Sequence, residues 1–388
     1  MNYCARFCLN SIINFTFADC VLINNVIEKM KHIVCIIESL GQGGAERQIA
    51  SLAGLLKEAG EDVELWTYYK NDFNKHILDD YGVTYRYLEE AQNKVKRVIV
   101  LKRLLTKHNA DVVISYMDSC SMALCLTKLL GAKYRLIVSE RSSTRSLNIH
   151  AKLKYFLYGL ADCVVPNSFA ESVAIKKFAP KLESKTETII NFTDTERFLP
   201  SLDLMSNSDI LHLLGVGRIT NAKNLLCYVD AIKMLREEGV DVMVEWYGNT
   251  TNEGLKQELL DKIHQLKLDS YFLLHPADNQ IEKIYPQFEA FCLPSIYEGF
   301  PNVICEAMSC GLPIICSDVC DNGYIVKDGV NGVLFDPGTP QNIAEGIKKY
   351  LKKMRRERLQ IGRENRERIK ELCSKEAFVG HYKKLIYQ

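Results

Sequence analysis

Two glutamates, Glu298 and Glu306, flank the start of a short predicted helix in the second half of the chain. The apolar run at residues 290–293 predicts a buried strand, and apolar residues at helical spacing over 302–310 predict the helix. A strand, a loop and a helix in this order point the helix N-terminus at the carboxyl edge of an α/β sheet, where such sheets bind ligands. We therefore expect a ligand site here. The alternative is a pair of solvated surface acids.

The same helix start offers positive charge. Pro301 precedes the helix, so the backbone N–H groups of Asn302 and Val303 are expected to lack helical partners. Free N–H groups and the helix dipole together favour a bound anion. Carboxylates nearby would repel a phosphate unless they face a neutral part of the ligand that is rich in hydroxyls. A nucleotide sugar, with phosphates at one end and sugar hydroxyls at the other, satisfies both requirements.

The glutamates belong to a longer pattern, E-G-F-P-N-V-x-x-E-A-M-x-C-G-x-P, at residues 298–313. This pattern resembles the signature of retaining glycosyltransferases of family 4. The string Ser139-Glu140-Arg141-Ser142 resembles the members that build bacterial surface polysaccharides. The resemblance covers residues 30–388 and implies the GT-B fold, an α/β architecture of two Rossmann-like domains that face each other across a cleft. It implies that Glu298 is catalytic and holds donor-sugar hydroxyls, and that Glu306 binds the ribose. The other donor-binding residues implied in this segment are Gly299, Phe300, Pro301, Asn302 and Val303.

A basic pair, Arg218 and Lys223, follows a predicted strand that ends at Gly217. The three residues resemble the family's G-R-x-x-x-x-K pattern, which implies that Gly217 contacts the donor and that both cations are catalytic groups gripping its diphosphate. A planar guanidinium and a mobile ammonium both suit phosphate oxygens. The alternative is a solvated basic loop. No DxD string is present, so we expect no metal and no cofactor, with the two cations in the metal's place.

A glycine pair, Gly43 and Gly44, follows the first predicted strand and precedes a helix with an apolar face. Glu46 stands where a G-x-G-x-x-G fingerprint needs its third glycine, so a dinucleotide site is disfavoured. The resemblance implies that this loop faces the interdomain cleft near the donor phosphate and the acceptor. The alternative is a tight turn that needs glycine for its backbone alone.

Candidate residues for the acceptor side follow two later strands in the first half of the chain. Asp118 and Glu140 stand at strand carboxyl ends, so both are expected to open onto the cleft. Many family members carry a histidine near Asp118, but this chain has Tyr116 and Met117 before it, so no histidine-based role is implied. Arg141 is expected either to meet the phosphate of a lipid-linked acceptor or to form a surface ion pair with Glu140 or a neighbour.

Composition is that of an ordinary globular protein long enough for two domains, with 388 residues of which 47% are hydrophobic. The net charge of +1 gives no overall attraction to nucleic acid. Fourteen cysteines are scattered without a CxxC pair or zinc-ligand spacing, which favours free thiols in a reducing cytoplasm.

Alternating strand and helix patterns predict parallel sheets and divide the chain into two sets of β–α units. Residues 30–200 predict an N-terminal Rossmann-like acceptor domain, and residues 201–370 a C-terminal Rossmann-like nucleotide-sugar domain. The resemblance implies that a helix over 371–388 crosses back to the N-terminal domain. Residues 1–29 do not match this pattern, so we expect an extension that is not native, or else an extra surface helix. A chain shortened to Met30 is expected to fold and remain active.

The function implied is a retaining hexosyltransferase that moves a sugar from a nucleotide sugar, a UDP-sugar rather than a GDP-sugar, to a lipid-linked or saccharide acceptor. The setting would be lipopolysaccharide or capsule synthesis in the cytoplasm. A first alternative is a GT-B-fold epimerase, which acts on the nucleotide sugar without an acceptor. A second is a catalytically inactive sugar-binding subunit, and the retention of all four charged residues in the two motifs argues against it.

Two basic segments predict weak peripheral contact with an anionic surface at the inner face of the plasma membrane. Residues 92–108 contain six Lys or Arg and no acid, interleaved with apolar residues. Residues 145–158 place Lys152 and Lys154 among aromatic residues, again without an acid. Each basic residue near such a surface contributes about 1 kcal/mol. The alternative is two ordinary amphipathic helices with their lysines in water.

Overall fold

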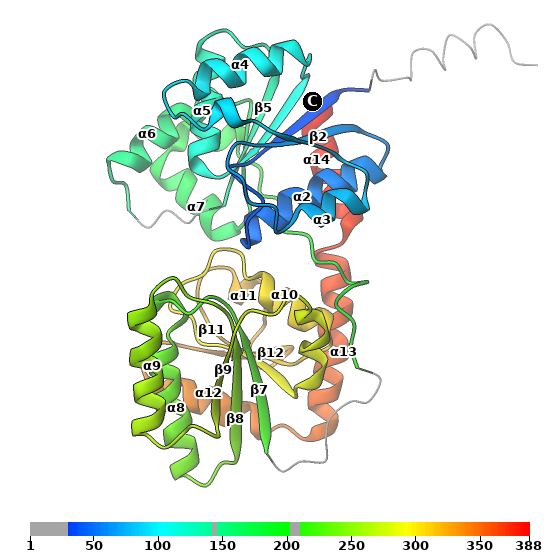
Figure 1. The fold of residues 1–388 in the computed structure, drawn as a ribbon. Coiled ribbons are helices and arrows are strands. Elements are labelled where there is room, and N and C mark those ends of the chain that lie inside the picture. Colours follow the sequence, from blue (N-terminus) through cyan, green and yellow to red (C-terminus); the bar gives the residue numbers. More distant parts are fainter. Residues whose placement is uncertain (1–29, 142–145, 202–209) are drawn as a thin grey trace, which may run out of the picture.

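The computed structural model describes residues 30–141, 146–201 and 210–388, which form two α/β domains (Figure 1). Each domain contains a six-stranded parallel sheet. The first sheet has the strand order β3 (Thr84–Tyr87), β2 (Asp62–Thr67), β1 (His32–Ile36), β4 (Val112–Tyr116), β5 (Arg135–Glu140) and β6 (Cys163–Pro166). The second has the order β12 (Gly332–Phe335), β11 (Ile314–Ser317), β10 (Ala290–Leu293), β7 (Leu211–Val216), β8 (Val242–Tyr247) and β9 (Phe272–His275). The predicted fold class is confirmed.

Helices connect the strands and cover both faces of each sheet (Figure 1). Those of the first domain are α2 (Gly44–Glu58), α3 (Lys75–Asp80), α4 (Arg97–Lys107), α5 (Asp118–Leu129), α6 (Ile149–Tyr158) and α7 (Phe169–Phe178). The second domain contains α8 (Leu225–Glu237), α9 (Glu253–Gln265), α10 (Asn302–Ser309), α11 (Asn322–Ile325), α12 (Pro340–Leu351) and α13 (Arg355–Leu372). The described chain ends with α14 (Lys375–Tyr387).

The two faces of the first sheet are covered by different helices because successive side chains of a strand alternate in direction. Ile33 and Cys35 of β1 belong to the core beneath α2 and α14. Val34 and Ile36 belong to the core beneath α4, α5 and α6. The continuous apolar run of β1 is thus that of a parallel strand buried on both sides.

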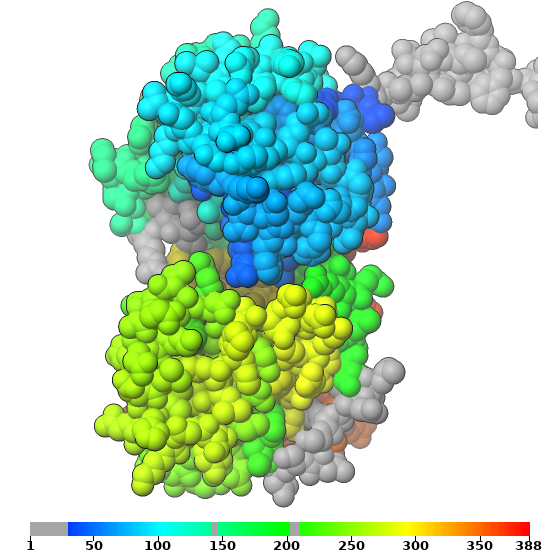
Figure 2. All heavy atoms as spheres, in the orientation of Figure 1, coloured from blue at the N-terminus to red at the C-terminus, as the bar shows by residue number. Residues whose placement is uncertain are grey.

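The strand order in each sheet reverses beside the strand that comes first in the sequence of that domain, β1 or β7. Such a reversal opens a crevice at the carboxyl ends of the strands. The loops after β1 and β4 carry the glycine pair and Asp118, and those after β7 and β10 carry the basic pair and Glu298. Figure 1 shows these two edges facing each other, and Figure 2 shows the two domains meeting at the boundary between them.

The end of the chain returns to the first domain (Figure 1, red). Helix α13 packs on α10, and the following α14 packs on α2 of the first domain. Phe378, Tyr382 and Leu385 of α14 are buried members of the first domain's core. The last helix therefore completes a core whose other members come from residues 33–189.

One sequence prediction falls outside the described residues, the extension at 1–29. In the described parts of the chain, no helix is both long and apolar enough to cross a membrane. The cysteines of the same parts are all free thiols, as expected.

Candidate active site

Lys223 and Glu298 meet at the carboxyl edge of the second sheet, although 75 positions separate them. They follow β7 and β10, which are neighbours in that sheet. Lys223 Nζ lies 2.6 Å from Glu298 Oε1, and Ser295 Oγ donates a hydrogen bond to the same oxygen at 2.5 Å. The structure thus brings together two residues that the sequence singled out from separate motifs.

The absence of a side chain at Gly217 leaves space for the side chain of Lys223. The Gly217 φ of +154° is a backbone conformation that L side chains rarely adopt, and a Cβ there would lie 2.8 Å from Lys223 Cε. Arg218 follows directly and is exposed at the same edge. Two cations therefore stand together at the end of β7, beside the carboxylate of Glu298.

The loop from Glu298 to Pro301 leads into α10, and its Phe300 is buried and anchors it to the domain. The N–H of Asn302 donates to the Phe300 carbonyl at 3.0 Å. This partner lies in the loop, so the amide lacks a helical partner as expected, but it is not free for an anion because the chain turns tightly at Pro301 and closes the bond within the loop. An anion at this end of α10 would rely on Val303 N–H and on the helix dipole.

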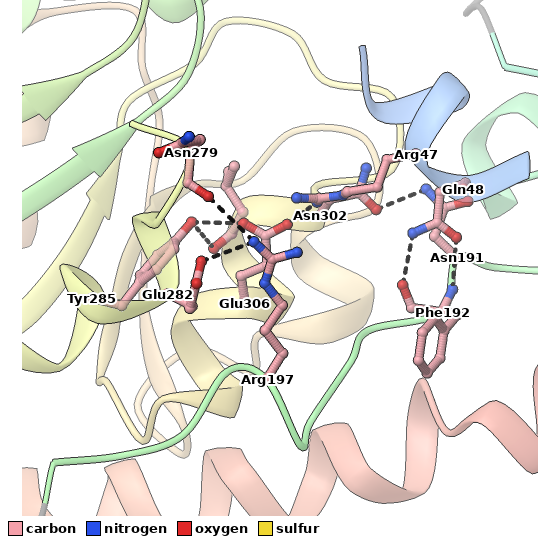
Figure 3. Close-up of polar contacts among 11 residues, drawn as sticks. Arg47, Gln48, Asn191, Phe192, Arg197, Asn279, Glu282, Tyr285, Asn302 and Glu306 are labelled. Carbon is pink, nitrogen blue, oxygen red and sulfur yellow. Dashed lines mark hydrogen bonds and ion pairs between the residues drawn. The ribbon is translucent and has the colours of Figure 1, made fainter. Parts of the chain in front are cut away.

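Glu306 lies one turn further along α10, and only 4% of its side chain is exposed. Tyr285 donates its hydroxyl to Glu306 Oε2 at 2.9 Å, and Arg47 of α2 in the first domain donates to Oε1 (Figure 3). The Glu306 carboxylate raises the pKa of Arg47. Burial raises the pKa of Tyr285, and Glu306 adds to that rise. Neither partner of Glu306 was predicted from the sequence. The signal for Arg47 was its place one turn after the glycine pair.

The glycine pair lies against the start of α10. A Cβ at Gly44 would approach Asn302 Nδ2 to 3.1 Å, which is tighter than ordinary van der Waals contact. Gly43 precedes α2 as its N-cap residue. Gly44 therefore faces the start of α10, and a side chain there would require the Asn302 amide to shift by a few tenths of an ångström.

A chain of polar contacts joins Arg141 to the start of α10. Arg141 donates to Asn191 Oδ1 and, at 3.1 Å, to the hydroxyl of Tyr382. Asn191 Nδ2 in turn donates to Asn302 Oδ1 at 2.8 Å. The alternative of an ion pair between Arg141 and Glu140 is wrong, because these neutral partners hold the guanidinium instead.

Asp118 and Glu140 form one charged cluster with Lys154 of α6. Lys154 Nζ lies 2.6 Å from Glu140 and 3.4 Å from Asp118. Glu140 is fully buried, so the expectation that it opens onto the cleft was wrong: α6 covers it. Burial raises the pKa of Glu140, and the charge of Lys154 opposes that rise. Met117, at φ 75°, turns the chain so that Asp118 begins α5 and keeps its side chain partly exposed.

The basic segments predicted to face a membrane are partly buried. Lys154 is 3% exposed, because it is the counter-ion of Glu140. Arg97 is also buried, and it donates to the Ala91 carbonyl and to the Tyr69 hydroxyl. These two cations therefore cannot contribute to a charged surface, and that part of the prediction was wrong.

No group of three or more His, Cys, Asp or Glu side chains within residues 30–141, 146–201 and 210–388 is arranged to hold a metal ion. The charges at the candidate site come from the side chains described above and from the start of α10.

Residues 205–368 match the family model described as "Glycosyl transferases group 1". The chain is 25% identical over 344 residues to a Campylobacter jejuni enzyme, N-acetylgalactosamine-N,N'-diacetylbacillosaminyl-diphospho-undecaprenol 4-alpha-N-acetylgalactosaminyltransferase, covering 83% of this chain and 90% of that protein. It is 30% identical over 262 residues to the Escherichia coli UDP-Gal:alpha-D-GlcNAc-diphosphoundecaprenol alpha-1,3-galactosyltransferase, covering 62% and 66%. The crystal structure of Anabaena HepE in complex with UDP and glucose has the same fold, with a TM-score of 0.79 at 17% identity over 91% of this chain and 98% of that one.

Proposed function

From the glycosyltransferase group 1 domain in the second half of this chain, we propose a retaining, metal-independent hexosyltransferase of family 4 that moves a sugar from a UDP-sugar to a lipid-linked saccharide. The observation that carries the proposal is the Lys223–Glu298 pair beside Arg218, at an edge that faces the first domain. The two relatives named above support the substrate classes, since both are named for diphospho-undecaprenol compounds and one for UDP-Gal.

The chemistry follows from where charge develops. Breaking the bond between the anomeric carbon and the diphosphate leaves negative charge on the departing oxygens. Lys223 is held at this edge by Glu298, and Arg218 is exposed at the same edge, so both can stabilise the transition state more than the bound donor. Glu298 orients Lys223 and accepts hydrogen bonds from the hydroxyls of the transferred sugar. Attack from the face of the leaving group then retains the anomeric configuration.

A transfer assay tests the function. Purified protein is incubated with a panel of UDP- and GDP-sugars, with and without an undecaprenyl-diphosphate-linked saccharide. We expect a lengthened saccharide from a UDP-sugar, and an anomeric coupling constant that shows the donor's configuration. Conversion of the nucleotide sugar without acceptor would identify an epimerase instead, and no turnover with any pair would indicate an inactive subunit.

Removal of divalent metal is expected to leave the transfer rate unchanged. Arg218 and Lys223 already supply the positive charge that a metal ion would bring to the diphosphate. The measurement compares initial rates in EDTA with those in added Mg²⁺ or Mn²⁺. A loss of activity in EDTA that either ion restores would show that the two cations are insufficient.

The acceptor side is proposed to approach an anionic membrane peripherally, at the cytoplasmic face, through α6. Ile149 is 83% exposed and Phe156 75%, and the side chain between them on the same face, Leu153, is exposed too. Lys152 is exposed beside them. An apolar stripe next to a basic residue suits insertion among anionic headgroups.

Liposome co-sedimentation tests this surface. We expect binding to anionic vesicles that falls as salt rises, and that weakens in the double variant Leu153→Gln and Phe156→Gln. The control is Leu260→Gln, an exposed leucine on α9 of the other domain. Equal binding to neutral vesicles, or no difference between the two variants, would remove α6 from membrane contact.

A further inference from the structure

The ion pair between Arg47 and Glu306 occupies the carboxylate that the family resemblance assigns to the donor's ribose. Arg47 holds Oε1 and Tyr285 holds Oε2, and the side chain of Glu306 has 4% of its surface exposed. A carboxylate can accept more than two hydrogen bonds, but a ribose must first reach it. With both oxygens engaged and the group covered, a partner must leave before the sugar can bind.

Of the two partners, Arg47 is the one that can leave. Tyr285 is fully buried, packs against the ring of Phe291 and donates to Glu306 from within the same domain. Arg47 belongs to the opposite domain and keeps 31% of its side chain exposed (Figure 3). A long, partly solvated side chain can turn into the cleft without breaking any packing of the second domain.

The helix that carries Arg47 is itself held firmly. Next to it, Gln48 forms two reciprocal hydrogen bonds with the backbone of Phe192, at 2.7 and 3.1 Å. These bonds fix the backbone next to Arg47, so its guanidinium reaches Glu306 from a defined position. The Arg47–Glu306 ion pair therefore forms in the domain arrangement described here.

We propose that Arg47 is an internal competitor for the ribose: nucleotide binding exchanges the Arg47–Glu306 ion pair for hydrogen bonds between Glu306 and the ribose hydroxyls. The inference rests on the proposed function, since it takes the ligand of Glu306 to be a nucleotide. It goes further in naming a residue of the acceptor domain that sets donor affinity. Because the pair bridges the domains, each binding event also breaks a contact between them.

Calorimetric titration with UDP tests the exchange. If the pair is closed in nine ligand-free molecules of ten, it raises the apparent Kd for UDP about tenfold, so Arg47→Ala is expected to bind UDP about tenfold more tightly than the wild type. Arg47→Lys keeps a shorter cation in reach and is expected to fall between them. The matched control is Lys57→Ala, which removes an exposed cation from the same helix and is expected to leave the Kd unchanged.

A second ligand ties the effect to the ribose. With inorganic pyrophosphate, which has no ribose to reach Glu306, binding need not open the ion pair, so Arg47→Ala is expected to give no gain. Weaker or unchanged UDP binding by Arg47→Ala and Arg47→Lys would overturn the competition, and so would an equal gain with both ligands. A wild type that binds neither UDP nor GDP would instead overturn the proposed function, and the competition with it.

Discussion

Replacing Arg218 or Lys223 by alanine is expected to lower kcat by a factor of about 10²–10³ while the protein stays folded. Both side chains stand at the end of β7, and Lys223 is already fixed by Glu298 at 2.6 Å. Positive charge that is fixed before the reaction acts mainly on the charge that develops in the transition state, so kcat should fall more than KM for the donor rises. Steady-state kinetics with the UDP-sugar found in the transfer assay, together with a melting curve, measure both expectations.

The control for these variants is Lys256→Ala, which removes an exposed cation from α9 of the same domain and should leave the kinetics unchanged. A kcat within a factor of about two of the wild type for both Arg218→Ala and Lys223→Ala would exclude them as the groups that stabilise the leaving diphosphate.

Glu298→Gln is expected to lower kcat by about 10², with little change in the melting temperature. The amide keeps the size of the side chain and an oxygen for Ser295, but it loses the charge that orients Lys223. It also accepts hydrogen bonds from sugar hydroxyls less strongly than a carboxylate does. The measurement is kcat at saturating donor and acceptor.

The comparison variant for this carboxylate is Glu258→Gln. Glu258 is an exposed acid on α9 of the same domain, and its loss should leave kcat close to that of the wild type. Equal losses in the two variants would mean that charge balance in the domain, rather than a contact with the sugar, sets the rate.

Features encoded locally could be predicted from the sequence. The strand, loop and helix around Glu298 follow from apolar spacing and from Pro301, and the structure begins α10 at Asn302, as predicted. The position of Arg218 and Lys223 could be predicted in the same way. An apolar run followed by a glycine predicts the carboxyl end of a buried strand, and these cations follow it. The fold class then follows from the alternation of such units along the chain.

The contacts that link distant segments could not be predicted in this way. Arg47 and Glu306 are separated by 259 positions, and nothing local to either residue specifies the other. Lys154 has the pattern of a surface lysine, yet it is buried because β5 ends in a carboxylate that needs a counter-ion. The backbone N–H of Asn302 donates to the Phe300 carbonyl because the turn at Pro301 is tighter than the helical pattern alone indicates.

The return of α14 to the first domain has a consequence for how the protein is made. Domains generally fold as units during synthesis, with the N-terminal one first. Here Phe378, Tyr382 and Leu385 follow the whole second domain in the sequence, so the core under β1 and α2 stays incomplete until α14 has emerged from the ribosome. The second domain, whose described strands and core lie within residues 198–373, can close its own core earlier. A gene fusion that transplants the first domain must therefore carry α14 with it.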